Sequence, residues 1–321
     1  MDILQVKNIF DTDPRHARAS FDRAYERGSA FTQGEYRPIG EAMVPIQDAG
    51  FIHADAAYDV VTASAGYMFR MDDHIARFNE SCTKFLLTNP YSDEETIEIL
   101  NNLVTLTGLQ DAYVWWAVTR GEMQGTRDNP TFINKFYAYV TPYVFVMGDD
   151  VRTRGGNIAI TRDIQRIPPE AVDPTAKNLH WMDMTLSLIG GLVGGADWSV
   201  LLDRNGNLTE APGCNIFVVA DGTLRTPARG CLEGITRRTV TELAGELGVG
   251  VDIGTVPAEE LETADEAFLT SSAGGIMPIT HVDGHPLKAG STPGPITREL
   301  HNRYWTKRWN GWLGDKITYN T

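Results

Sequence analysis

The stretch AVDPTAKNLHW, residues 171–181, places a single lysine between a proline-containing turn and a run of apolar residues. This residue, Lys177, is one of only seven lysines in a chain of 321 residues. Most lysines near the start of a helix are solvated surface residues. A lysine that is withdrawn from water instead becomes a nucleophilic amine, able to form a Schiff base with an aldehyde. The stretch alone is compatible with both interpretations.

Length and composition favour two domains and exclude some classes of partner. A chain of 321 residues, 42% of them hydrophobic, exceeds one ordinary domain. The formal net charge of −14 argues against nucleic acid, whose phosphates require clustered Lys and Arg, although one or two arginines suffice for a small anion. The seven histidines lack the spacing of metal ligands, so we expect no metal.

The cysteines indicate a reduced compartment. Cys82, Cys214 and Cys231 are odd in number and show no CxxC spacing, which is typical of a cytoplasmic protein. The first residues have no long apolar core, and no apolar run is long enough to span a bilayer. We therefore expect a cytoplasmic protein with no membrane partner.

Hydrophobic periodicity predicts a small α+β domain over residues 1–146. Ser92, followed by Glu95, forms a capping box that predicts a helix from this point to about Gly108. The other predicted elements are a hairpin over 30–38, two strands within 51–70, a helix over 72–87, and strands over 111–120 and 132–146 with a polar loop between them.

Residues 147–156, MGDDVRTRGG, are polar and glycine-rich, and we interpret them as an interdomain linker. A larger domain follows over residues 157–321. Its predicted elements are a strand at 157–162, helices over 178–190, 235–247 and 296–312, a meander over 199–227 with Asn-Gly and Asp-Gly turns, and a strand within 266–279 that runs into a turn of small residues.

Two charged residues are candidates for binding a cofactor. Glu210, in NLTEAPGCNIF, follows one predicted strand and precedes another. It is either an ordinary turn carboxylate or a group in a cleft, where it would keep the ring nitrogen of a lysine-bound pyridoxal phosphate protonated. Arg77 lies off the apolar face of its predicted helix. It is therefore either solvated or a guanidinium fork for phosphate.

Two loops have features of anion sites. Gly234 precedes a predicted helix whose first turn offers backbone N–H groups and the positive end of the helix dipole. The loop SSAGG, residues 271–275, consists of small residues and hydroxyls that allow close approach to a phosphate. Neither signal is specific alone. The absence of a GxxxxGK(S/T) motif and of a strand-GxGxxG-helix motif disfavours a nucleotide.

Several blocks of the sequence together resemble one family. In chain order they are DAGFIHADAAYDVV, DDHIARF, VTRG, DPTAKNLHW, LTEAPGCNIF, LEGITR and SSAGGIMPI. The set is similar to that of fold-type IV pyridoxal-phosphate aminotransferases, which include branched-chain aminotransferase, D-amino-acid transaminase and the (R)-selective amine transaminases. The resemblance implies a two-domain fold of mixed α+β and α/β type. It also implies pyridoxal 5'-phosphate between the domains and a homodimer whose sites lie near the interface.

The resemblance further implies roles for single residues. Lys177 resembles the lysine that binds the cofactor as a Schiff base and transfers the substrate proton, and Glu210 resembles the partner of the pyridinium nitrogen. The residues that resemble the phosphate contacts are Arg77, Ser272 and the backbone of Ile235 and Thr236. Leu232 resembles the leucine that packs on the ring face.

Within the family, the (R)-selective amine transaminases are the most similar branch, on HADAAYDV (53–60), KNLHW (177–181) and AGGIMPI (273–279). That branch implies an arginine after VTRG that moves to bind a substrate carboxylate, and Arg127 is the candidate. One pocket then accepts an apolar amine and a keto acid in turn. The side chains expected to line it are His53, Tyr58, Tyr113, Trp115, Trp181, Ser271 and Ala273.

The run YVWWAV, residues 113–118, departs from that branch, in which a smaller or acidic residue is expected here. Strand alternation sends Trp115 to the face of Tyr113 and Trp116 to the opposite face. Which of the two rings faces the substrate stays open at this point. Either would restrict the pocket to small or flat substituents.

We therefore expect a homodimeric transaminase that moves an amino group from an (R)-amine, or a D-amino acid, to a keto acid such as pyruvate. A D-amino-acid transaminase or a branched-chain L-aminotransferase of the same fold is the alternative. A ligand-binding homologue without catalysis is a more distant alternative, and the presence of both Lys177 and Glu210 argues against it.

Overall fold

The computed structural model describes residues 2–319, which form two compact units. The seven-stranded unit comprises Ile9–Val144, Ala176–His180 and the residues from Arg308 onward. The eight-stranded unit comprises the residues up to Asn8, Phe145–Thr175 and Trp181–Lys307. The short segment that carries Lys177 therefore belongs to a different unit from the chain on either side of it.

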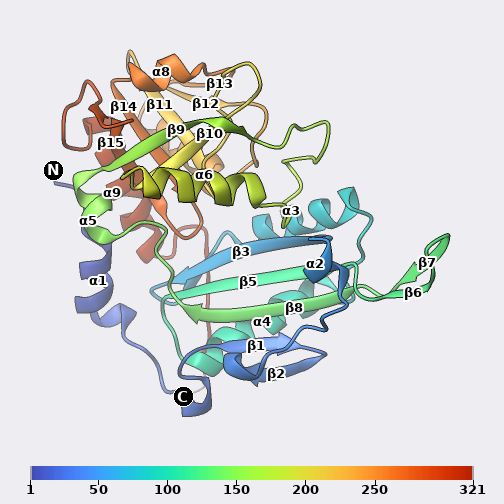
Figure 1. Ribbon diagram of the computed structural model, residues 1–321. Coiled ribbons are helices and arrows are strands. Elements are labelled where there is room, and N and C mark those ends of the chain that lie inside the picture. Colours follow the sequence, from blue (N-terminus) through green and yellow to red (C-terminus); the bar gives the residue numbers. More distant parts are fainter. Residues whose placement is uncertain (1, 320–321) are drawn as a thin grey trace. The chain divides into compact units, whose positions relative to one another are not determined.

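The seven-stranded unit is built on an antiparallel sheet with the order β17-β4-β3-β5-β8-β1-β2 (Figure 1). The hairpin predicted around Gly34 and the strand pair predicted around Ala65 and Gly66 are confirmed. The strands are β1 Ser29–Thr32, β2 Glu35–Pro38, β3 Ala56–Ser64, β4 Tyr67–Phe69, β5 Ala112–Thr119, β8 Lys135–Pro142 and β17 Gly314–Lys316.

Helices α3, Met71–Lys84, and α4, Asp93–Thr107, pack on one face of this sheet (Figure 1). Of the predicted apolar face of this helix, Ile75, Phe78 and Cys82 are buried in the core with the strands and Phe85 packs against it. Leu86, also predicted on this face, lies beyond the end of α3 and is exposed. Ser92 and Glu95 close the predicted capping box at the start of α4. The short helix α2, Ala49–Ile52, precedes β3, and α1, Val6–Thr12, lies near the N-terminus.

The polar loop predicted between the two long strands is instead a second hairpin. Strands β6, Met123–Thr126, and β7, Asn129–Phe132, pair with each other and extend beyond the ends of β5 and β8 (Figure 1). Every residue of both strands is exposed. Neither strand therefore shows the alternation of apolar and polar residues that identifies a half-buried strand.

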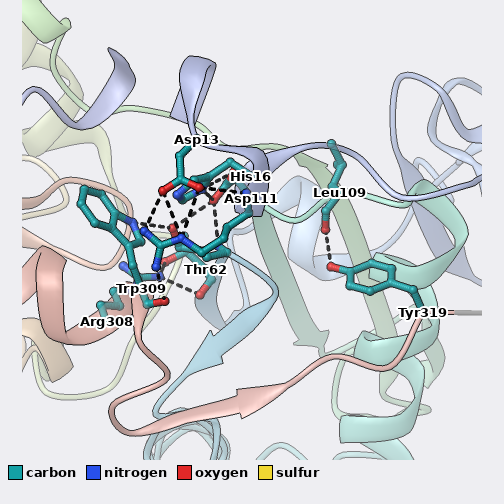
Figure 2. A network of polar contacts seen from close by, with 11 residues as sticks. Asp13, His16, Thr62, Leu109, Asp111, Arg308, Trp309 and Tyr319 are labelled. Atoms are coloured by element: carbon teal, nitrogen blue, oxygen red, sulfur yellow. Dashed lines mark hydrogen bonds and ion pairs between the residues drawn. The ribbon is translucent and has the colours of Figure 1, made fainter. Parts of the chain in front are cut away.

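Segments that are far apart in the sequence meet at one end of this sheet, as Figure 2 shows. The His16 ring nitrogen Nδ1 lies 2.8 Å from the carboxylate of Asp111. Arg308 Nη2 donates to the carbonyl and the hydroxyl of Thr62 at 2.8 and 2.6 Å, and the Tyr319 hydroxyl donates to a backbone carbonyl before β5. Residues 308–319 are thus part of the packed seven-stranded unit.

The eight-stranded unit contains a mixed sheet with the order β10-β9-β15-β14-β11-β12-β13, and β16 pairs with β15. The pairs β9/β10, β9/β15 and β12/β13 are parallel, and the others are antiparallel. The strands are β9 Gly156–Gln165, β10 Trp198–Leu202, β11 Asn215–Ala220, β12 Thr223–Pro227, β13 Val251–Gly254, β14 Glu266–Ser271, β15 Gly275–Val282 and β16 His285–Pro286.

The helices of this unit are α5 Asp149–Arg154, α6 Met182–Val193, α7 Ile235–Glu246, α8 Ala258–Glu262 and α9 Pro295–Trp309, whose last residues pass into the other unit. The predicted α7 and α9 are confirmed. Helix α6 begins four residues later than predicted, because Lys177 and Asn178 instead pair along β3. Within residues 147–156, the structure has α5, with Arg152 buried. No helix within residues 2–319 is long and apolar enough to cross a membrane.

His301 of α9 is a buried histidine in the eight-stranded unit. Its Nδ1 lies 2.8 Å from the carbonyl of Ile276, and its Nε2 lies 3.2 Å from that of Leu4. Burial lowers the pKa of His301 to about 4, although both carbonyls favour the charged ring. The folded-state pKa is depressed, so the contribution of His301 to stability is complete above its unfolded pKa and is lost as the pH falls toward the folded value.

We predict that replacing this ring flattens the pH dependence of stability. Between pH 7 and pH 5, His301 should cost the wild type about 2 kcal/mol of unfolding free energy, because only the unfolded chain takes up its proton. His301→Gln should therefore lose about 2 kcal/mol less over that range in urea unfolding. His285→Gln, at an exposed position, is the matched control and should keep the wild-type slope. An unchanged slope in His301→Gln would contradict the assignment.

Candidate active site

Lys177 is held by its backbone on both sides. The Tyr58 N–H of β3 donates to the Lys177 carbonyl at 3.0 Å, and the Lys177 N–H donates to Ser81 Oγ of α3 at 3.0 Å. The Lys177 Nζ lies 3.3 Å from the Tyr58 hydroxyl and 4.4 Å from the centre of that ring. Lys177 is half-buried, and its amine lies against a phenol.

Arg77 of α3 is paired with a fully buried carboxylate, Asp59 of β3. Arg77 Nε donates to Asp59 Oδ2 at 2.8 Å, and Arg77 Nη2 donates to Oδ1 at 2.7 Å. Burial alone would raise the pKa of the Asp59 carboxyl, but the adjacent Arg77 charge holds it below its usual range. The carboxylate is therefore ionised, and the guanidinium is fixed in a bidentate pair.

Glu210 is buried and accepts a hydrogen bond at each carboxylate oxygen. Arg166 Nε donates to Oε1 at 2.9 Å, and the Leu232 N–H donates to Oε2 at 3.1 Å. Arg166 Nη1 also donates to Asp183 Oδ2 at 2.7 Å. Burial opposes the charge of Arg166, but the two carboxylates outweigh it and raise its pKa. Arg166 thus links the two carboxylates and fixes Glu210 in position.

The start of α7 offers unpartnered backbone donors. Gly234 is the N-cap residue, and no side chain caps the helix. Within residues 2–319, no hydrogen bond reaches the N–H groups of Ile235 and Thr236, both of which are buried residues. A side chain at Gly234 would meet Asn215 Oδ1 at 2.1 Å, so the close packing of this loop requires glycine. The combination of free N–H groups and helix dipole suits an anion.

The turn at 271–275 lies at the same end of the sheet. Strand β14 pairs with β11 so that Thr270 is opposite Asn215, the residue that packs against Gly234. Gly274 N–H donates to Ser271 Oγ at 2.8 Å and closes the turn. Ser272 is half-buried and Ala273 is buried. The eight-stranded unit therefore groups Glu210, Leu232, the start of α7 and this turn.

Aromatic rings form a continuous row on the face of the seven-stranded sheet that carries Tyr58. The Tyr58 and Trp115 rings stack with centroids 5.9 Å apart, and Trp115 stacks on Tyr139 at 5.2 Å. Tyr113 continues the row, 6.2 Å from Tyr139. Burial raises the pKa of Tyr113 and of Tyr139, which keeps both hydroxyls neutral. This row, from Tyr58 to Tyr113, is called the aromatic row below.

Trp116 points to the opposite face of the sheet. It is fully buried in the core beside Phe78 of α3, with ring centroids 5.7 Å apart. The alternative that the sequence left open is thus resolved at the level of packing: Trp115 shares the face of Tyr58, and Trp116 belongs to the core.

Comparison with known proteins identifies the family. The pattern of the family described as amino-transferase class IV matches residues 56–282. This range includes Arg77, Lys177 and Glu210. The chain is a class IV aminotransferase.

The relatives of this aminotransferase differ in substrate. It is 30% identical to the D-alanine aminotransferase of Listeria monocytogenes over 279 residues, which are 82% of this chain and 90% of that protein. It is 30% identical to the branched-chain-amino-acid aminotransferase of Pseudomonas aeruginosa over 258 residues, 80% of this chain and 83% of that protein. A structure of the branched-chain aminotransferase from Thermoproteus uzoniensis with norvaline has a TM-score of 0.83 at 25% identity, covering 90% of this chain and 99% of that one. The predicted family and mixed fold are confirmed.

Class IV aminotransferases use pyridoxal 5'-phosphate, and the aminotransferase has donors and acceptors that fit this group. Lys177 offers an amine beside a phenol. Glu210 offers a buried carboxylate fixed by Arg166, which suits a protonated pyridine ring. In the eight-stranded unit, the N–H groups of Ile235 and Thr236 make no hydrogen bond within the described part of the chain, and in the seven-stranded unit the same holds for Arg77 Nη1. Each of these donors suits an acceptor oxygen of a phosphate.

Of three further predicted pocket residues, two are exposed in the seven-stranded unit and one belongs to the eight-stranded unit. His53 is exposed at the end of α2, and Arg127 is exposed in the turn of the β6–β7 hairpin. Within residues 2–319, neither makes a hydrogen bond or ring contact with Lys177 or Tyr58. Trp181 belongs to the eight-stranded unit, where its ring packs on the tight turn at Gly213, three residues after Glu210.

Sequence reasoning did not find the partners of the charged site residues. Arg166 and Asp183 bind or support Glu210, and Asp59 and His74 surround Arg77. No periodic pattern marks a buried ion pair, because its two members lie far apart in the chain. The signal that was available was weak: His74 and Arg77 are three residues apart and therefore share one side of a helix.

The two tryptophans provide a test of which face of β5 belongs to the core. Trp116→Ala should lower the unfolding free energy by about 3–5 kcal/mol, because it leaves a large cavity beside Phe78. Trp115→Ala is the matched control on the half-buried face. It should lower the unfolding free energy by less than half as much, measured by urea unfolding with the same dependence on urea concentration. Equal losses in the two variants would mean that both rings contribute to one core.

Proposed function

We propose that this aminotransferase moves an amino group from an (R)-amine to a keto acid such as pyruvate, with pyridoxal 5'-phosphate as cofactor. The observation that carries the proposal is the aromatic row beside Lys177. Neither β3 nor β5 has a Lys or Arg on the face of the sheet that carries Tyr58 and Trp115. A permanent partner for a substrate carboxylate is therefore absent from these two strands, whereas an aryl group gains favourable contact.

The proposed roles of the residues follow from their surroundings. Pyridoxal phosphate, when bound, supplies an aldehyde for an amine and a ring that withdraws electrons. We assign the Schiff-base bond and the transfer of the substrate proton to the Lys177 amine, which the Tyr58 hydroxyl orients. Glu210, fixed by Arg166, keeps the proton on the ring nitrogen. The proposed contacts of the phosphate are Arg77, Ile235, Thr236 and Ser272. Leu232 is the proposed contact of the ring face.

The substrate side of the proposal rests on apolar contact. A phenyl group buried against Tyr58, Trp115 and Tyr113 would contribute roughly 1.5–3 kcal/mol by leaving water, with about 0.5–1.5 kcal/mol more where the rings stack favourably. His53, Trp181, Ser271 and Ala273 complete the proposed pocket wall. Arg127, on its exposed hairpin, is proposed to supply a positive charge only when the keto acid is bound.

A D-amino-acid transaminase is the second candidate, supported by the 30% identity to the D-alanine aminotransferase of Listeria monocytogenes. Such a substrate carries its carboxylate in both half-reactions and requires a fixed cation. Arg127 is the proposed clamp in that case. A branched-chain L-aminotransferase is the third candidate, on the relatives from Pseudomonas aeruginosa and Thermoproteus uzoniensis.

We also propose a cytoplasmic homodimer. Helix α6 supports the dimer, because Met182, Leu186, Ile189 and Val193 lie on one side of it and are 47–84% exposed. The cytoplasmic location is supported by the three cysteines, which are free thiols and buried.

A single-turnover absorbance trace tests the proposed function. The purified protein with pyridoxal phosphate should show the visible band of the lysine-bound cofactor, and (R)-1-phenylethylamine should bleach it while the (S) enantiomer does not. Bleaching only by D-alanine or by L-leucine would contradict the amine specificity and move the enzyme to the corresponding alternative. Lys177→Ala should show no turnover and should stay folded by circular dichroism. Turnover in that variant would remove Lys177 from its role.

Arg127→Ala tests the proposed carboxylate partner. The variant should slow the half-reaction with pyruvate by roughly 10- to 100-fold, which corresponds to the loss of a charge-assisted hydrogen bond. The half-reaction with the (R)-amine should stay within about twofold, because that substrate has no carboxylate. Gln124→Ala, in the same exposed hairpin, is the matched control. Equal slowing of both half-reactions would show that Arg127 does not select the keto acid.

A further inference from the structure

Asp59 is a charged residue that the proposed function does not use directly. Its side chain points to the helix side of the seven-stranded sheet, where it is fully buried among residues of the core. It accepts two hydrogen bonds from Arg77, at 2.7 and 2.8 Å, and one from His74 Nδ1 at 2.8 Å. A buried carboxylate is costly unless it is paired and fully hydrogen-bonded. The structure meets that requirement with residues of one helix.

The geometry of the pair determines which guanidinium nitrogen stays available. Asp59 occupies Nε and Nη2 of Arg77, so Nη1 is the nitrogen that makes no hydrogen bond within residues 2–319. The Arg77 side chain retains 10% exposure, against 0% for Asp59. The two ends of the arginine fork thus have different surroundings, one in the core and the other near the surface.

His74 fixes the carboxylate in turn. Its ring is buried, and burial lowers the pKa of His74 below its ordinary value despite the adjacent Asp59. The neutral ring donates from Nδ1 to Asp59 Oδ1, the oxygen that Arg77 Nη2 also contacts. Beyond Arg77 on the same helix, Ser81 donates to the Arg77 carbonyl at 2.8 Å and accepts the Lys177 N–H. The backbone of Arg77 and that of Lys177 therefore share one hydroxyl.

We propose that Asp59, supported by His74, is the positioning residue that holds Arg77 with its Nη1 directed to the phosphate of the cofactor. The inference rests on the proposed function, in which Arg77 binds that phosphate. It differs from a purely structural role in one respect. A core ion pair that only stabilised the fold would support every ligand of Lys177 equally, whereas a positioning residue acts on the phosphate alone.

Two aldehydes separate these roles, because pyridoxal 5'-phosphate and pyridoxal share the ring and the aldehyde and differ in the phosphate. The cofactor-free protein is titrated with each, and dissociation constants are read from the visible band of the Lys177 adduct, without any turnover. Asp59→Asn should weaken binding of pyridoxal phosphate roughly 10- to 100-fold, as expected when a buried charged pair loses its partner. Binding of pyridoxal should change less than about threefold.

Further variants keep the test decisive if Asp59→Asn is unstable. His74→Gln should give a smaller loss in the same direction, specific to the phosphorylated aldehyde. Arg77→Lys should reproduce the loss, and combining Asp59→Asn with Arg77→Lys should add little, since both act through one guanidinium. Asp73→Asn is the matched control, because Asp73 lies on the same helix as Arg77 and pairs with Arg70, the N-cap residue, at a more exposed position. It should leave the preference for the phosphorylated aldehyde unchanged.

The outcomes distinguish this inference from the proposed function. If the wild type prefers pyridoxal phosphate and Asp59→Asn keeps the full preference, the positioning role is wrong and the cofactor assignment stands. An equal loss for both aldehydes would also overturn the positioning role, since it indicates a structural ion pair. If the wild type binds both aldehydes equally, Arg77 holds no phosphate, and both the inference and that part of the proposed function fail.

Discussion

The pairing of the Lys177 segment with β3 is the interaction on which the rest of the site depends. The Tyr58 N–H binds the Lys177 carbonyl, and Asn178 bridges to Ala57. These bonds attach five residues, Ala176–His180, to the seven-stranded unit although the chain before and after them belongs to the other unit. The pairing also ends the run of residues that would otherwise extend α6 toward the lysine. The position of the amine beside the Tyr58 phenol follows directly from this backbone register.

Each unit uses buried carboxylates to orient an arginine. In the seven-stranded unit Asp59 holds Arg77, and in the eight-stranded unit Glu210 and Asp183 hold Arg166. The fork of Arg77 has one nitrogen, Nη1, that makes no hydrogen bond within residues 2–319 and suits an anion. Arg166 instead divides its donors between two carboxylates, which fixes Glu210 in position.

The two faces of the seven-stranded sheet have different surroundings, because side chains alternate strictly along β5. Trp116 and its neighbours build the core with α3 and α4, and Trp115 extends the aromatic row. In the proposed function, the aromatic row contacts the aryl group of the amine. Arg127, the proposed partner of a substrate carboxylate, lies on an exposed hairpin whose strands, within residues 2–319, pair only with each other.

The sequence by itself determined most of the local elements and the family, and through resemblance it supplied the proposed site residues. Apolar spacing predicted α3, a capping box predicted α4, and turn residues predicted the hairpins, because these features depend on near neighbours in the chain. Seven blocks in the chain order expected of the family, DPTAKNLHW among them, implied Lys177, Glu210 and Arg77 through resemblance. The start of α6 and the hairpin at β6 and β7 were not predicted correctly, since one depends on pairing with a distant strand and the other has no buried face.

Only the tertiary structure decided how these residues are held. Asp59 is 18 positions from Arg77, and Arg166 is 44 positions from Glu210, and no local pattern records that either pair is buried together. The same holds for the choice between Trp115 and Trp116. Alternation places them on opposite faces of the sheet but does not say which face the helices cover. The physical reason is common to all three cases. Burial and ion pairing depend on which distant segments fold against a residue, and a sequence read locally does not contain that information.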